Sequence, residues 1–156
     1  MTNNDMLRKI RYAFDFSDSK MIEIFALAED EVTREEVSNY MKREEDPDYK
    51  SLHDKKFATF LNGLINDKRG KREGPQPKPE KTLTNNIIFR KLRIALNLTD
   101  KDILDIYGLI KMTVSKHELS ALFRKPGQKQ YRECKDQFLR NFLHGMQIKY
   151  RNEMED

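Results

Sequence analysis

The feature that most constrains this chain is an internal duplication. Residues 3–14 read NNDMLRKIRYAF and residues 85–96 read NNIIFRKLRIAL, and a shift of 82 residues aligns the two halves without a gap. The same register brings Phe60, Leu61 and Gly63 onto Phe142, Leu143 and Gly145. A single register kept over most of both halves indicates a tandem duplication, so a fold that suits one copy must suit the other.

Each copy has the pattern of four helices. Apolar residues recur at helical spacing, and the period-2 alternation of strands is nearly absent. We expect the first helix over about 4–14 with an asparagine N-cap, and the fourth over about 54–68 or 135–150. The second helices should begin at Ser17 and Thr99, and the third with two capping boxes, Thr33 with Glu36 and Ser115 with Glu118.

These patterns predict an all-α fold of two tandem homologous four-helix subdomains, related by a pseudo-twofold axis and joined by a Pro-rich linker. The expected division is repeat 1 at 1–69, the linker at 70–84, repeat 2 at 85–151 and a C-terminal tail at 152–156. Four-helix units of this size are marginal alone, so we expect the copies to share an interface. The linker should begin where Gly70 ends a helix, and its alternating prolines favour an extended polyproline II strut.

The two NN…RK-x-R openings, FLNGLI followed by KRG, and ECKDQFLRNFLHG resemble the YehS-like bacterial proteins. That family is a duplicated domain of unknown function, and the resemblance covers nearly the whole chain. It implies a small cytoplasmic helical protein and implies no reaction.

A basic trio opens both copies, Arg8, Lys9 and Arg11 in one and Arg90, Lys91 and Arg93 in the other. One interpretation is a phosphate-contacting face used twice. The other is a solvated face, or arginines that pair with carboxylates of the next helix.

The second and third helices of the second copy have the length and phasing of a helix-turn-helix. Lys116, His117, Ser120 and Arg124 would then point outward, and Leu119, Leu122 and Phe123 inward. Two packed helices without a DNA-reading role are the simpler alternative. The first copy has Glu44, Glu45 and Asp46 after its third helix, and these would repel phosphate.

Charge is divided unequally between the copies. Residues 1–69 carry a net −3, residues 70–84 a net +2 and residues 85–156 a net +5. A nucleic-acid partner would therefore contact the second copy, with Arg90, Lys91, Arg93, Lys116 and Arg124 as the candidate residues. The opposite charges could equally help the two copies dock on each other.

Gly63 and Gly145 lie within otherwise regular helices, where glycine costs about 1 kcal/mol relative to alanine. Their repetition predicts a close approach of another helix, with a ligand-facing notch as the alternative.

Residue patterns for catalysis are missing. No histidine is repeated between the copies, and no P-loop, G-x-S-x-G or H-E-x-x-H motif occurs. Cys134 aligns with Leu52, which suits a small buried apolar group. Asp54 and Asp136 repeat at the start of the fourth helix, where the helix dipole explains them; an acid/base pair across the axis is the alternative.

We therefore expect a non-enzymatic, cytoplasmic binding module without metal, cofactor or membrane span, which contacts nucleic acid through its second copy. The alternative is an interaction or assembly module that binds a protein in the groove between the copies, and a third possibility is an unrecognised enzyme. The sequence leaves the oligomeric state open.

Overall fold

The computed structural model describes residues 1–155, which form eight α-helices and no β-strand. The first copy contains α1 (Asn3–Phe14), α2 (Asp18–Leu27), α3 (Arg34–Met41) and α4 (Asp54–Arg69); the second contains α5 (Asn85–Leu96), α6 (Asp100–Gly108), α7 (Lys116–Leu122) and α8 (Asp136–Glu155). Every helix of the second copy begins 82 residues after its counterpart. The predicted all-α fold of two homologous four-helix units is therefore confirmed. Each helix in this part of the chain is too short or too polar to span a bilayer.

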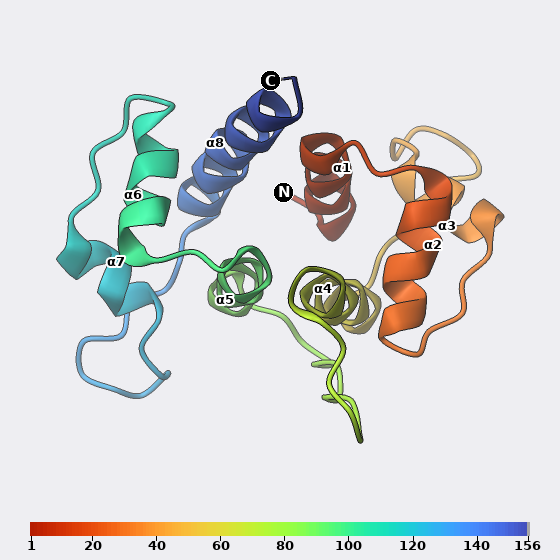
Figure 1. Cartoon of the computed structure of the whole chain (residues 1–156), viewed down its shortest axis with the longest axis horizontal. Helices are drawn as coiled ribbons and strands as arrows, with labels where there is room; N and C mark the ends of the chain where they lie inside the picture. The colour runs from red at the N-terminus through yellow and green to blue at the C-terminus, as the bar shows by residue number, and fades with distance from the viewer. Residues whose placement is uncertain (156) are drawn as a thin grey trace.

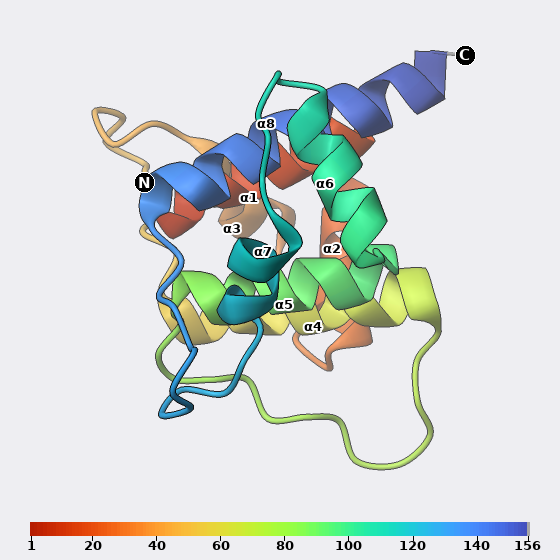
Figure 2. The same cartoon turned by 90° about the vertical axis from the view of Figure 1, so that its left-hand side faces the viewer.

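The first and fourth helices of both copies form the centre of the molecule (Figure 1). α1 packs along α8 and α5 packs along α4, so each first helix makes its main contacts with the other copy. The pairs α2–α3 and α6–α7 flank this centre on opposite sides, and Figure 2 shows α1 beside α8 in one layer and α4 beside α5 in the next. The exchange is reciprocal, as the expected pseudo-twofold relation requires.

Both copies contribute to one continuous core. The largest fully buried side chains come from each half, and they are Phe25, Phe57, Phe60, Phe89, Tyr107 and Phe142. Complete burial of one such side chain contributes about 1.5–3 kcal/mol. The expectation that the copies share an interface is thus confirmed.

The helix starts follow the sequence signals with one exception. Both predicted capping boxes are formed at α3 and α7, and Ser17 and Thr99 cap α2 and α6. The prediction of an asparagine N-cap for the first helices is wrong, because Thr2 and Thr84 hold that position. Their hydroxyl groups accept the backbone N–H groups of the first turn, which leaves the asparagine side chains free for other partners.

One of those asparagines, Asn86, is buried and fixes the loop between α7 and α8. Its side-chain amide donates to the carbonyl oxygens of Leu122 and Arg132, both at 2.9 Å, and its oxygen accepts the Cys134 N–H at 2.9 Å. In the first copy, Asn4 makes the same three bonds with the residues 82 positions earlier: Tyr40, Lys50 and Leu52. The repeated asparagine is therefore a structural clamp between the first helix and the loop before the fourth.

Replacing Asn86 by alanine should lower the free energy of unfolding by about 2–3 kcal/mol, because buried backbone groups lose their partners. Chemical denaturation measures this loss, with the exposed Asn152→Ala as the control, expected within about 0.5 kcal/mol of the parent. Equal stability of the two variants would contradict the clamp.

The two repeated glycines lie where helices cross. A Cβ atom at Gly63 would come within 1.9 Å of the Ile24 carbonyl oxygen, and one at Gly145 within 2.5 Å of the Ile106 carbonyl oxygen. These are crossings of α4 with α2 and of α8 with α6, inside each copy. The predicted close approach is confirmed, and it explains why neither copy has gained a side chain there.

Gly63→Ala and Gly145→Ala should both melt below the parent, because a clash with backbone costs about 1–3 kcal/mol and exceeds the gain in helix propensity. The shorter distance at Gly63 makes its variant the less stable of the two. Gly108→Ala is the matched control: it is also helical, but a Cβ there meets open space, so it should melt above the parent. Thermal unfolding tests all three, and a Gly145→Ala melting temperature at or above that of the parent would refute the clash.

The fourth helices end differently in the two copies. α4 ends at Arg69, and Gly70 follows it with a φ of 92°, as the sequence predicts. α8 continues to Glu155, beyond the expected end near residue 150. Asn152 occupies the position of Gly70, and the ion pair of Lys149 with Glu153, 3.1 Å apart, supports the added turn.

Candidate functional site

The last arginine of each basic trio, Arg11 or Arg93, fixes the turn between the first two helices of its copy. In the second copy, Arg93 Nε donates to the Leu98 carbonyl oxygen at 3.2 Å, and Nη2 lies 2.8 Å from an oxygen of Asp100. In the first copy, Arg11 makes the same contacts with Phe16 and Asp18, at 3.0 and 2.7 Å. The carboxylate-pairing interpretation therefore explains this repeated arginine.

Arg8 and Arg90 differ in how their charge is compensated. Both donate to a backbone carbonyl near the end of the third helix, Arg8 to Lys42 at 3.0 Å and Arg90 to Phe123 at 2.8 Å. Arg8 also forms an ion pair with Asp5 in its own helix, but Ile87 occupies the equivalent position beside Arg90. Among residues 1–154 no carboxylate pairs with Arg90, which is exposed, so its positive charge faces solvent.

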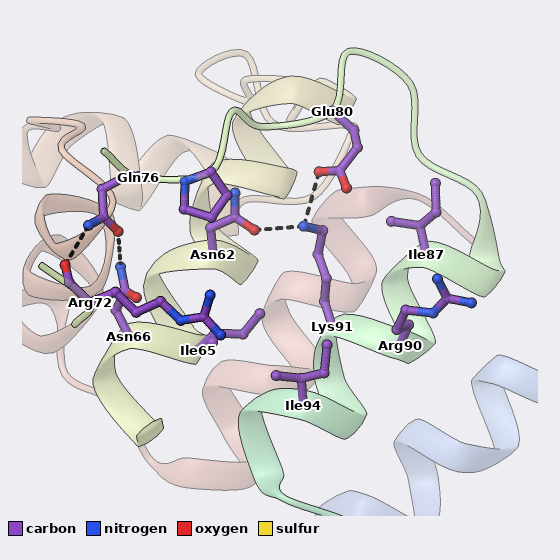
Figure 3. Close-up of a pocket in the computed structure, with 11 residues that line it drawn as sticks. Asn62, Ile65, Asn66, Arg72, Gln76, Glu80, Ile87, Arg90, Lys91 and Ile94 are labelled. Carbon is purple, nitrogen blue, oxygen red and sulfur yellow. Dashed lines mark hydrogen bonds and ion pairs between the residues drawn. The ribbon is translucent and has the colours of Figure 1, made fainter. Parts of the chain in front are cut away.

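Lys91 does not share the surface of the two arginines. Its ammonium group lies 2.6 Å from the Asn62 side-chain oxygen and 3.0 Å from a carboxylate oxygen of Glu80. Its side chain is only 12% exposed, so Lys91 points between α5, α4 and the linker (Figure 3).

Three of the predicted arginines gather around Phe123, at the end of α7. The Arg93 guanidinium lies 4.6 Å from the centre of the Phe123 ring, Arg90 donates to its carbonyl oxygen, and Arg124 follows it in the chain. Lys116 is exposed at the other end of α7, and seven residues of sequence lie between it and Arg124. The structure therefore brings Arg90 and Arg93 to Phe123, which precedes Arg124 in the chain, and places Lys116 at the opposite end of α7.

The exposure pattern of α7 agrees with two packed helices. Leu119 and Leu122 are buried, Phe123 is partly buried, and Lys116 and His117 are exposed. The inward residues and two of the four predicted outward residues agree with the sequence prediction, whereas Ser120 and Arg124 are only partly exposed. A DNA-reading role for α6 and α7 stays a prediction, because the same faces result from packing alone.

The loop after Phe123 adds basic residues that the sequence analysis missed. Residues 124–135 carry five basic side chains and one acidic one, whereas the equivalent residues 42–53 carry three basic and four acidic. The exposed basic members are Lys125, Lys129, Arg132 and Lys135. A comparison of the loops position by position across the 82-residue offset would have revealed this difference.

A pocket with a volume of about 290 Å³ lies between α4, α5 and the linker (Figure 3). Three polar contacts hold the linker over it. Gln76 accepts a bond from Asn66 at 3.0 Å, Glu80 pairs with Lys91, and the Leu83 N–H donates to Asp54 at 2.8 Å. The linker therefore occupies part of the groove in which a protein partner was expected.

The residues considered for catalysis have structural partners. Asp54 and Asp136 accept the side-chain amides of Asn3 and Asn85, at 2.8 and 2.7 Å, each within its own copy. Cys134 is buried, and this burial, together with the nearby Asp136 and Glu133 charges, raises the pKa of its thiol to about 12. Within residues 1–155, no three His, Cys, Asp or Glu side chains gather so as to hold a metal ion.

Cys134 should resist alkylation in the native protein. Its pKa rises from 9.0 to about 12, so at pH 8 its reactive thiolate should be roughly a thousandfold scarcer than in the unfolded chain. Mass spectrometry after iodoacetamide treatment measures the rate, with urea-unfolded protein as the control. Similar rates for native and unfolded protein would contradict the assignment of Cys134 as a buried, neutral thiol.

Comparison with known proteins agrees with the repeat. The sequence pattern of the family described as "Protein of unknown function (DUF1456)" matches residues 3–70 and again residues 85–152. The chain is similar to "Uncharacterized protein YehS" of Escherichia coli (strain K12), with 41% identity over 147 residues, which cover 94% of each chain. No solved structure has a significant match. The resemblance seen in the sequence motifs is thereby confirmed.

Proposed function

Because the chain belongs to the DUF1456 family, whose function is unknown, we propose from its surface chemistry that it is a non-enzymatic module that binds nucleic acid through its second copy. The interface comprises Arg90, Arg124 and the basic loop at 124–135. We call this the basic surface. Arg93 supports the interface because its guanidinium packs on the Phe123 ring. Lys91 is not part of the interface because it faces the linker.

The observation that carries the proposal is a difference in charge between two loops that have the same backbone arrangement in the two copies. The loops at 42–53 and 124–135 are held by the same asparagine clamp, yet one is acidic and the other strongly basic. At the edge of the basic loop, the carboxylate that neutralises Arg8 is replaced by Ile87 beside Arg90. Packing does not require either change, whereas a polyanionic partner would favour both.

Contacts of this kind recognise the phosphate backbone. Exposed lysines and arginines that neutralise phosphates release counterions, which supplies affinity without reading the base sequence. We therefore expect binding that varies little with sequence and falls steeply with salt. A duplex, single-stranded DNA and RNA each present the required charge.

The test compares two triple variants that remove the same charge from opposite copies. Lys125→Gln, Lys129→Gln and Arg132→Gln together neutralise the basic surface, and all three side chains are exposed. Arg43→Gln, Lys55→Gln and Arg69→Gln do the same on the exposed surface of the first copy. Arg93 is left intact because its loss would disturb the turn before α6.

Fluorescence anisotropy with labelled duplex DNA, single-stranded DNA and RNA at low salt measures the affinity. The variant in the second copy should bind about tenfold or more weakly, and its plot of log affinity against log salt should flatten by about 2–3 units of slope. The variant in the first copy should stay close to the parent. Absence of parent binding to all three probes, or equal losses in the two variants, would remove the proposal.

A further inference from the structure

We propose that the pocket between α4, α5 and the linker binds a small amphipathic anion, a ligand with a short apolar body and one negatively charged head group. Its volume of about 290 Å³ is close to the lower end of the range for small-molecule sites. The pocket and the basic surface have only Arg90 in common, and the experiments below leave Arg90 unchanged, so they test the pocket independently of nucleic-acid binding.

Both helices contribute apolar side chains to the pocket, beside polar and charged ones. Ile65 comes from α4, and Ile87 and Ile94 come from α5 (Figure 3). Pro77 of the linker also lines the pocket. Ile94 is 46% exposed, which is unusual for a branched aliphatic side chain inside a recess. An apolar ligand body would remove this surface from water.

The charged groups at the pocket are predominantly positive. Lys91 is compensated by Glu80, 3.0 Å away. Arg72 from the linker and Arg90 from α5 also line the pocket, and neither pairs with a carboxylate of residues 1–154, whose side chains the structure describes. The Arg90 guanidinium donates to the Phe123 carbonyl oxygen, at the edge of the pocket. A ligand in contact with the isoleucines therefore meets the uncompensated Arg72 guanidinium, which favours a carboxylate or a phosphate.

The second groove of the molecule shows that this lining is not a requirement of the fold. The groove between α8 and α1 is the pseudo-twofold equivalent, and the positions of Ile65, Ile87 and Ile94 are occupied there by Gln147, Asp5 and Tyr12. Arg151 covers the Tyr12 ring, with its guanidinium 4.0 Å from the ring centre. The helices pack in both grooves, yet only the groove beneath the linker is lined by three isoleucines.

The linker makes the groove a pocket. Its contacts at Gln76, Glu80 and Leu83 are polar and lie along the segment that crosses α4 and α5. These contacts hold the linker in place across α4 and α5. The result is a preformed recess rather than a flat apolar face.

The first experiment titrates octanoate or octyl phosphate into the ¹⁵N-labelled full chain and follows amide signals by NMR. Octylamine is the control, since it has the same apolar body and a positive head group at neutral pH. Either anion should shift the signals of Ile65, Ile87 and Ile94, and octylamine should bind about tenfold or more weakly. Unchanged signals with both anions, or equal binding of octylamine, would overturn the proposal.

The second experiment uses variants matched across the pseudo-twofold axis. Ile94 and Tyr12 occupy equivalent positions and are 46% and 54% exposed, so glutamate at either site is compatible with folding. Ile94→Glu should weaken binding of the anion by about tenfold or more, because it adds a negative charge to the pocket, and Tyr12→Glu should not change it. Equal losses would refute the assignment of the site to this groove.

Arg72→Gln tests the head-group contact, with the neighbouring exposed Lys71→Gln as its control. Loss of one exposed guanidinium should weaken octanoate or octyl phosphate binding by about threefold. The same loss in both variants, or in neither, would show that Arg72 does not contact the ligand and would overturn the proposed head-group site.

Discussion

The exchange of first and fourth helices between the copies is the interaction on which the rest of the structure depends. α1 packs along α8 and α5 along α4, so the central layer is assembled from both halves. A copy separated from its partner would expose the face of its first helix that contacts the other fourth helix. Units of this size bury too little surface to tolerate that loss. The two copies consequently form one folding unit rather than two independently folded domains joined by a linker.

Residues that are repeated in the two copies and residues that differ between them have separate causes. The repeated Asn4 and Asn86 satisfy buried backbone groups, and the repeated Gly63 and Gly145 allow helices to cross. Each of these repeats is explained by the fold. The difference in charge between the two loops and the isoleucines of one groove have no such explanation, and these differences define the basic surface and the pocket. In a duplicated chain, a functional site is better sought where the copies disagree.

Much of the fold could be predicted because its signals are local. Helix periodicity and the capping boxes act within one or two turns of chain, so the sequence reports them directly. The helix crossing at Gly145 is a long-range contact, and it was predictable only because Gly63 repeats the glycine in the other copy. Periodicity shows which face of α1 is apolar but not that α8 covers it, because that choice depends on the whole assembly. The same limit applies to Lys91, whose partner Glu80 lies on the linker, and to the pocket, which exists only where the linker crosses two helices.

The linker that closes this pocket also changes the thermodynamics of assembly. If two separate copies formed the same structure, its stability would depend on protein concentration, and symmetry would force their two grooves to be identical. Residues 70–84 join the halves, so each first helix meets its partner at a fixed effective concentration however dilute the protein is. The same covalent join lets a substitution enter one groove without entering the other. A single chain can therefore keep a dimer-like architecture and use each of its halves for a different purpose.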